Sequence, residues 1–281
     1  MRRYSLVFLM ATGFLTMSAS LAAASVAVGQ LGSPSGPCTA NNDVLETGVA
    51  AGPSFTMPET GTITSWSHSA IIGSGQTLTM KVFRPVPDPN LHIYRVVAHD
   101  GPKPVNSGLL NTFPVSIPVQ AGDILGLNTA GGGAGCICSG APGDTLAIRN
   151  STNLADGEAA DFVLPTGNVR LDISAVLTPS NTLTVAKTAF NKKKGTATLN
   201  LTLPNPGQLT ASGNGVKAAS AGAVISKSVT AGPTQLLIKA KGKKKKTLNE
   251  TGKVKLNVAV TYTPTGGDAK TQSQKVKLIK R

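Results

Sequence analysis

Lysines gather in two runs in the C-terminal part of the 281-residue chain. The first run is Lys192, Lys193 and Lys194, and the second is Lys241, Lys243, Lys244, Lys245 and Lys246. Ammonium groups this close together repel one another and stay hydrated, so we expect the second run in an exposed loop between two strands. Such a surface can bind anionic polymers: teichoic or uronic acids of a cell wall, phospholipid headgroups or DNA. The alternative is a solubilising face whose lysines keep strand edges from aggregating.

Few residues near these lysines could read a nucleic acid sequence. Phe190 and Tyr262 are the only aromatic residues after residue 178, too few for a base-stacking platform. Arg281 is the only arginine there, so this part of the chain has almost no side chains for bidentate contacts to base edges. The pattern predicts an anionic cell-wall polymer or glycan as partner, without sequence-specific nucleic acid binding.

Trp66 is the only tryptophan of the chain, and Tyr94 lies in another candidate strand. A flat aromatic face stacks well on a sugar ring, so these two residues could form a carbohydrate-binding site. Tryptophan side chains are more often largely buried, which favours a place in the core for Trp66.

The chain has three cysteines: Cys38, Cys136 and Cys138. In an oxidising compartment thiols pair, and an odd number leaves one over. We expect Cys38 to pair with Cys136 or Cys138, which would close a loop of about 100 residues and contribute about 4–5 kcal/mol of stability. A short Cys136–Cys138 bridge is the tighter alternative.

Residues that could form a catalytic or metal centre are scattered. His92 and His99 are separated by an odd number of positions, so a regular strand turns them to opposite faces, and with His68 they do not predict a zinc site. No G-x-S-x-G elbow accompanies them, and the Gly-rich stretch 131–140 lacks the Lys of a phosphate-binding loop. The remaining acidic candidates indicate solvated turns rather than a glycosidase pair: Asp156, Glu158 and Asp161. We therefore expect no enzyme, no metal and no cofactor.

The N-terminus has the parts of a secretory signal peptide. Met1-Arg2-Arg3 is basic, Leu6–Met17 is uncharged and mostly apolar, and small residues allow cleavage after Ala24 or Ala27. We assign residues 1–27 to the signal peptide and expect an extracellular protein, with retention at the cell surface as a further expectation. No second stretch predicts a transmembrane segment in the mature protein.

Short β-rich runs, separated by clusters of Gly, Pro, Asn and Asp, fill residues 28–178. Thr77–Val82 and Asn168–Ser174 alternate polar with apolar residues, which places one face of each strand on a core and the other in water. About eight such runs predict a jelly-roll-like antiparallel β-sandwich.

Residues 179–182 predict a short linker, and the alternation becomes more regular in residues 183–281. Leu199, Leu201 and Leu203 alternate with polar residues. A unit of about 100 residues with six or seven strands predicts an immunoglobulin- or fibronectin-like sandwich. The predicted fold class is all-β, with no helix after the signal peptide.

Three stretches resemble the lysine-rich Ig-like modules at the C-termini of secreted actinobacterial proteins: Lys194–Leu199 through Pro206-Gly207, Ile238–Gly242 and Thr261–Gly267. Two more, Ile63–His68 and Val119–Leu127, are similar to uncharacterised secreted β-sandwich proteins of those bacteria. The resemblance implies a secreted protein of two β-sandwiches, and it carries no catalytic residues with it.

The net charge of +14 is divided very unevenly along the chain. Residues 1–178 hold 8 basic and 11 acidic residues, whereas residues 179–281 hold 19 basic and 2 acidic ones. We expect a non-catalytic cell-envelope or extracellular protein whose basic module docks on anionic envelope polymers. A carbohydrate-binding protein that uses the first sandwich and a secreted hydrolase are the alternatives, and the opposite charges of the halves also predict head-to-tail self-association.

Overall fold

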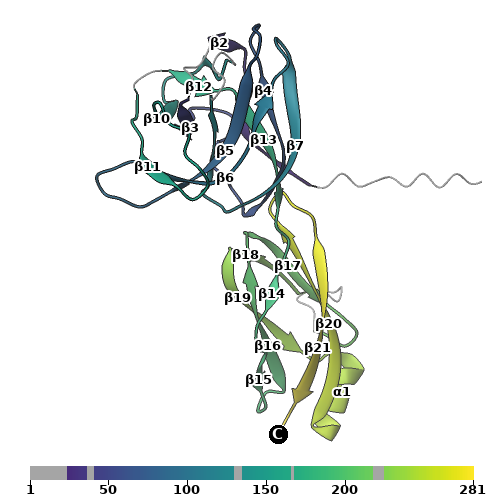
Figure 1. Ribbon diagram of the computed structural model, residues 1–281. Coiled ribbons are helices and arrows are strands. Elements are labelled where there is room, and N and C mark those ends of the chain that lie inside the picture. The colour runs from purple at the N-terminus through teal and green to yellow at the C-terminus, as the bar shows by residue number, and fades with distance from the viewer. Residues whose placement is uncertain (1–23, 37–40, 130–134, 166–167, 218–224) are drawn as a thin grey trace, which may run out of the picture.

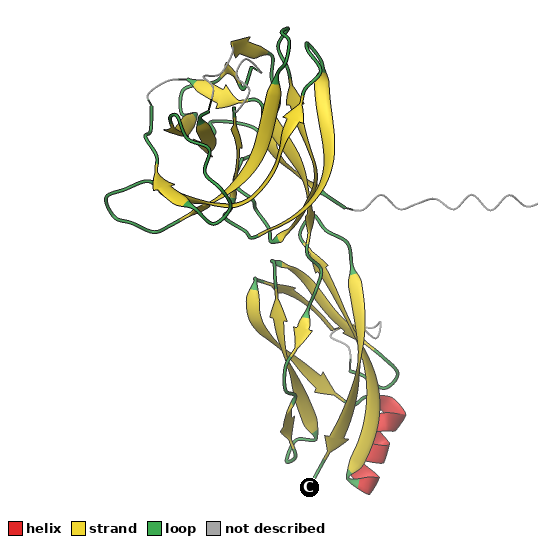
Figure 2. Ribbon diagram, viewed as in Figure 1, coloured by secondary structure: helices red, strands yellow, loops and turns green. Residues whose placement is uncertain are grey.

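The structure is a computed structural model that describes residues 24–36, 41–129, 135–165, 168–217 and 225–281. Nearly all of its regular structure is β-strand, arranged in two bodies that lie end to end (Figures 1 and 2). Every strand pairing between the described residues is antiparallel. The predicted all-β antiparallel sandwich class is confirmed, while the jelly-roll and immunoglobulin-like assignments stay predictions.

The first domain contains a four-stranded, a six-stranded and a small three-stranded sheet. The four-stranded sheet has, in spatial order, Val26–Gln30 (β1), Ile173–Pro179 (β13), Gly61–Ser69 (β4) and Leu110–Val119 (β7). The six-stranded sheet has Thr145–Arg149 (β10), Asp43–Gly48 (β3), Ile124–Asn128 (β8), Thr77–Pro85 (β5), Ile93–Pro104 (β6) and Ala159–Asp161 (β11). The third sheet has Val169–Leu171 (β12), Ile137–Ser139 (β9) and Pro34–Gly36 (β2).

The core of the first domain is one cluster of apolar side chains, to which both larger sheets contribute. Ile63 and Leu177 come from the four-stranded sheet, Phe83 and Leu125 from the six-stranded sheet, and all four are fully buried. Period-two alternation explains this arrangement, because every second side chain of a strand points to the same face. The sheets thus hold each other in place through the burial of apolar surface.

One face of β5 departs from the predicted pattern. The alternation of Thr77–Val82 predicts that Thr79 and Lys81 face water, but these side chains are only 3% and 1% exposed. The connection between β10 and β11 lies against Lys81, which donates a hydrogen bond to the Leu154 carbonyl there. A polar residue in an alternating strand is therefore not always on a solvent face.

The second domain pairs a sheet around Thr196–Leu203 (β16) with a sheet around Lys253–Pro264 (β20). The strands that complete the first sheet are Thr184–Val185 (β14), Ala189–Asn191 (β15) and Gly232–Lys239 (β19). Those that complete the second are Ile225–Val229 (β18), Gly207–Ser212 (β17) and Lys270–Ile279 (β21). Their inward aliphatic side chains form a separate core that also contains Tyr262.

The prediction that the second lysine run forms a loop is wrong, because Gly242–Thr251 is an α-helix (α1). Lysine is a good helix former, and Leu248 anchors the helix as its buried residue. Gly252 ends it in the left-handed conformation at φ 71°, where its N–H donates to the Leu248 carbonyl. The sequence does not predict this helix because it has no apolar stripe. Leu248 is its one buried residue.

The predicted domain boundaries stay predictions. Strand β13 ends at Pro179, the first residue of the predicted linker 179–182, and β14 begins at Thr184. Strand β1, however, begins at Val26, two residues before the predicted start of the first domain. Residues 1–23 lie outside the described part of the chain, and a start after Ala24 leaves β1 whole.

Candidate functional site

Helix α1 lies at the end of the second domain that is away from the first domain (Figure 1). Lysines from several elements lie beside this helix. A cavity of about 490 Å³ opens there between the helix and the two sheets. Its lining includes six lysines: Lys194, Lys217, Lys239, Lys241, Lys245 and Lys280. We call these six residues the lysine face.

Two further hollows adjoin the same helix. One, of about 540 Å³, is lined by Lys244 of α1 and by outward lysines of the sheet: Lys255, Lys275 and Lys277. The other, of about 610 Å³, lies between the first turn of α1 and the turn Gly213–Val216. The positive charge therefore extends beyond one cavity and surrounds the helix.

This charge has little local compensation. Glu250 and Asp268 are the only acidic residues after residue 178, and Glu250 forms a long ion pair of 3.8 Å with Lys246. The first turn of α1 contains no acidic residue, and Lys241 at its N-cap makes no side-chain capping bond. Because the helix N-terminus itself carries positive partial charge, its lysines raise the electrostatic energy of the unliganded protein. An anion in the cavity would lower it.

The structure brings together only part of the predicted lysine set. Lys194, Lys241 and Lys245 line the first cavity, and Lys243 and Lys244 line the hollow beside it. The other members, Lys192, Lys193 and Lys246, are exposed outside these hollows.

Sequence reasoning missed the lysines that stand singly: Lys217, Lys239, Lys255, Lys275, Lys277 and Lys280. The only sequence feature that these lysines share is a position that alternates with apolar residues in a strand or lies next to a strand end. That signal shows which residues face solvent, but it does not show which strand ends meet.

The structure contradicts the alternative in which Trp66 stacks on a sugar. The indole is fully buried, packs on the Phe113 ring at a centroid distance of 4.5 Å, and donates from Nε1 to Asp100 Oδ2 at 2.8 Å. Its face is thus not available to a sugar. Tyr94 is half-buried and meets Phe162 edge-on at 5.4 Å, and burial raises the pKa of its hydroxyl. Both residues belong to the packing of the first domain.

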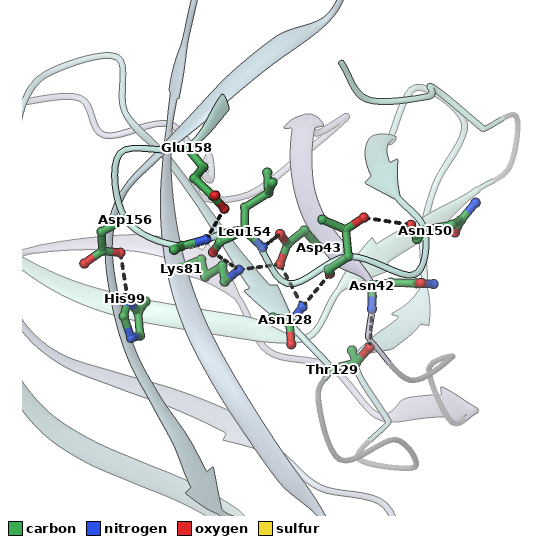
Figure 3. Close-up of polar contacts among 12 residues, drawn as sticks. Asn42, Asp43, Lys81, His99, Asn128, Thr129, Asn150, Leu154, Asp156 and Glu158 are labelled. Carbon is green, nitrogen blue, oxygen red and sulfur yellow. Dashed lines mark hydrogen bonds and ion pairs between the residues drawn. The ribbon is translucent and has the colours of Figure 1, made fainter. Parts of the chain in front are cut away.

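A buried polar network lies on the covered face of the six-stranded sheet (Figure 3). Lys81 Nζ is 2.7 Å from Asp43 Oδ1, and both side chains are excluded from solvent. Asn128 Nδ2 also donates to Asp43 Oδ1, at 2.8 Å, and to the Thr152 carbonyl at 3.0 Å. Every charge in the network is hydrogen-bonded, as burial in a low-dielectric interior requires.

The three acidic residues considered for catalysis each bond to a different partner. Asp156 Oδ1 is 2.7 Å from His99 Nδ1, and both are well exposed (Figure 3). Glu158 accepts the N–H of Ala155 at 2.8 Å, and Asp161 accepts the N–H of His92 at 2.8 Å. These bonds use each carboxylate separately, so the three do not form a pair flanking a cleft.

A second buried cluster surrounds Cys138. This cysteine is a free, buried thiol whose pKa is raised by burial and by the nearby Asp172 carboxylate, so it is not an activated nucleophile. His68 Nδ1 lies 2.7 Å from the Asp172 carbonyl. Within the described ranges, no group of three or more His, Cys, Asp and Glu side chains is arranged to hold a metal ion. Because Cys138 is free, the pairings Cys38–Cys138 and Cys136–Cys138 are ruled out. The pairing Cys38–Cys136 stays a prediction, since Cys38 lies outside the described residues.

Neither a protein-family model nor a curated protein matches the chain. In the part that the structure describes, no helix is long and apolar enough to cross a bilayer. The charge and shape of the lysine-lined cavity therefore carry the functional proposal.

Proposed function

We propose that this protein is a non-catalytic component of the cell envelope or its surroundings, and that its second domain docks on an anionic wall polymer. The observation that carries the proposal is that six lysines from separate segments line one cavity beside α1. Lysines that only served solubility would be spread over the surface. Here the fold gathers them, which creates a concentrated positive potential for multivalent anions.

The chemistry of the lysine face favours a flexible polymer with repeated phosphate or carboxylate groups. Lysine ammonium groups act as mobile point charges and do not impose the planar, bidentate geometry of arginine. The side chains that line the cavity include no aromatic residue on which a base could stack. A wall polymer therefore fits this surface better than a nucleic acid does.

Head-to-tail self-association has less support than the charge division suggests. Of the 11 acidic residues before residue 179, six are buried: Asp43, Glu46, Glu59, Asp123, Asp144 and Asp172. The acidic charge of the first domain therefore lies largely inside it and offers little surface to the lysine face of another copy.

Co-sedimentation of the full mature chain with isolated cell walls tests the proposal. Lys239→Gln/Lys245→Gln removes two charges from the lysine face, and the matched control Lys187→Gln/Lys270→Gln removes two exposed charges elsewhere in the domain. We expect the first variant to bind several-fold more weakly and the control to bind nearly as the unmodified chain does. Equal loss in both variants would contradict a localised site.

Double-stranded DNA, anionic lipid vesicles and walls stripped of teichoic acid serve as competing ligands at the same salt concentration. We expect intact walls to bind most tightly. Tighter binding to DNA or vesicles would overturn the assignment of the wall polymer, and no binding at low salt would overturn electrostatic docking as a whole.

A further inference from the structure

Lys81 and Asp43 occupy an unusual position in the six-stranded sheet. Strand β8 lies between β3 and β5, and Asn128 on β8 faces Asp43 on one side and Thr79 on the other. Alternation then places Asp43, Asn128 and Lys81 on one face. The Lys81 side chain crosses the middle strand to reach Asp43, and its Nζ lies 2.7 Å from Oδ1 (Figure 3).

The contacts around this pair match those of an acyl-transfer site. Asp43 Oδ1 accepts a hydrogen bond from Asn128 Nδ2 and Oδ2 accepts one from the Leu154 N–H, both at 2.8 Å. Neutral N–H donors on both oxygens would stabilise the negative charge of a tetrahedral intermediate, as an oxyanion hole does. The Leu154 carbonyl holds the amine in place at 2.7 Å from Nζ.

The geometry points to an intramolecular amide bond between Lys81 Nζ and Asp43 Cγ. One proton passes from the ammonium group to the carboxylate, which gives an amine and a carboxylic acid in contact. The amine then attacks Cγ, the Nζ–Cγ bond forms, and one Cγ–O bond breaks. That oxygen leaves as water with two of the three ammonium protons. Atoms and charges balance, and neither an oxidant nor a co-reactant is needed.

Two physical effects favour this condensation in the interior. A held amine and carboxyl group react with an effective concentration of about 10⁵–10⁸ M, which offsets the preference for hydrolysis in bulk water. A buried ion pair is also a weak source of stability, because the desolvation of both charges opposes their attraction. The amide removes both charges. Its N–H remains a donor for the Leu154 carbonyl, and its one remaining oxygen is the acceptor for Asn128 Nδ2 and the Leu154 N–H. The amide would clamp β3 to β5 across β8.

The molecule contains its own control for the reaction. Lys103 Nζ and Asp100 Oδ1 form an ion pair at 3.1 Å, but their side chains are 38% and 16% exposed. Water solvates this amine and competes for the carboxyl carbon. We expect Lys103 and Asp100 to stay unlinked in the same sample.

Peptide mass spectrometry of the reduced and denatured full chain, digested with trypsin and with a protease that cleaves after glutamate, tests the inference. Cleavage after Glu46 and Glu59 places Asp43 and Lys81 in separate peptides, since no tryptic site lies between them. We expect one branched species that joins the peptides of Lys81 and Asp43 and has lost one water, with fragment ions that locate the link. Lys81→Arg keeps the positive charge but removes the nucleophilic amine, so its digest should yield the Asp43 peptide unlinked.

Four results would overturn the inference. The first is recovery of both peptides from the unmodified chain, separate and at full mass. The second is a linear Asp43 peptide that has lost water, since this is a succinimide. The third is a link from Lys81 to Asn128 with loss of ammonia, and the fourth is a dehydrated Asp43 peptide that persists in Lys81→Arg. None of these depends on polymer binding, so the proposed function is tested separately.

Discussion

Asn205 and Thr60 form two reciprocal hydrogen bonds across the joint between the domains. The Thr60 N–H donates to Asn205 Oδ1 at 2.7 Å, and Asn205 Nδ2 donates to the Thr60 carbonyl at 2.8 Å. Asn205 also donates to the Ser180 carbonyl at 3.1 Å, while its own carbonyl accepts the Tyr262 hydroxyl at 2.7 Å. One buried amide thus ties the first domain, the linker and the second core together.

We expect Asn205→Ala to destabilise the joint by about 1–3 kcal/mol, because it removes the acceptor of the Thr60 N–H and the donor to the Ser180 carbonyl, while the Thr60 carbonyl keeps the Ser180 N–H. Urea denaturation and limited proteolysis at residues 179–182 measure the effect, and proteolysis should become faster. Asn200→Ala is the control, since the hydrogen bonds of the Asn200 side chain to Lys187 and Gln235 are exposed to water, which can replace them, and we expect a change of about 0.5 kcal/mol. Equal changes in the two variants would contradict the special role of Asn205.

Glu46 should make the protein less stable as the pH rises. Burial raises its pKa from 4.5 to about 8, against the hydrogen bond from the Leu171 N–H. A raised pKa in the folded state means that the contribution to stability is complete below pH 4.5 and is lost as the pH rises through about 8. Unfolding free energies should fall by on the order of 4 kcal/mol across that window.

Glu46→Gln provides the comparison for this pH dependence, because it keeps an acceptor for Leu171 but does not titrate. Chemical denaturation at pH 5 and pH 8.5 should show a much smaller decrease in the variant than in the unmodified chain. If both proteins lose the same stability, Glu46 is not the group responsible.

Trp66→Ala should cost about 3–5 kcal/mol of unfolding free energy, since it removes a fully buried aromatic side chain. Trp66→Phe keeps most of the packing on Phe113 but loses the bond to Asp100, so a smaller loss of about 1 kcal/mol is expected. Thermal unfolding measures both. Glycan binding that disappears in Trp66→Phe while the fold is intact would contradict the buried role of the indole.

Leu248→Ala should weaken polymer binding without changing any charge. Leu248 is the buried residue that holds α1 on the domain, and its truncation is expected to cost about 2–5 kcal/mol. Loss of helical circular dichroism together with weaker wall binding would show that the folded helix positions the lysines. Leu248→Met, a change of similar volume, is the control and should keep both. Full binding by a variant whose helix has melted would argue against that positioning.

Cys138 should react with a thiol reagent only after denaturation, because it is buried and its pKa is raised. Under denaturing, non-reducing conditions we expect one labelled cysteine per chain, located at Cys138, and three after reduction. Peptide mapping identifies the positions. Three labelled cysteines before reduction would exclude the predicted Cys38–Cys136 bridge.

Alternation predicts most of the strands because an antiparallel sandwich repeats one local rule. The predicted strand Thr77–Val82 lies within β5 and begins at the same residue, and Leu199, Leu201 and Leu203 are buried as expected. The rule fails where a distant segment covers a strand from outside. Lys81 looks like a solvent-facing residue until the chain near Leu154 is placed over it.

Only part of the lysine face could be predicted from the sequence, because it also depends on segments that are distant along the chain. The run Lys241–Lys246 shows local charge, but Lys217, Lys239 and Lys280 join it only because three chain segments end beside the same helix. Helix α1 itself depends on one buried leucine, too weak a pattern to be recognised by periodicity. Convergence of this kind depends on topology, which local patterns do not encode.

The dependence of binding on salt tests the central claim most directly. The dissociation constant of the full mature chain for poly(glycerol phosphate) is measured from low to physiological salt, and its logarithm is plotted against that of the salt concentration. Each lysine that neutralises a phosphate contributes about 0.7 to the slope. We predict a steep slope for the unmodified chain and for Lys187→Gln/Lys270→Gln, and a slope lower by about 1.4 for Lys239→Gln/Lys245→Gln. A flat slope, or one that the lysine-face variant leaves unchanged, would contradict electrostatic docking at this surface.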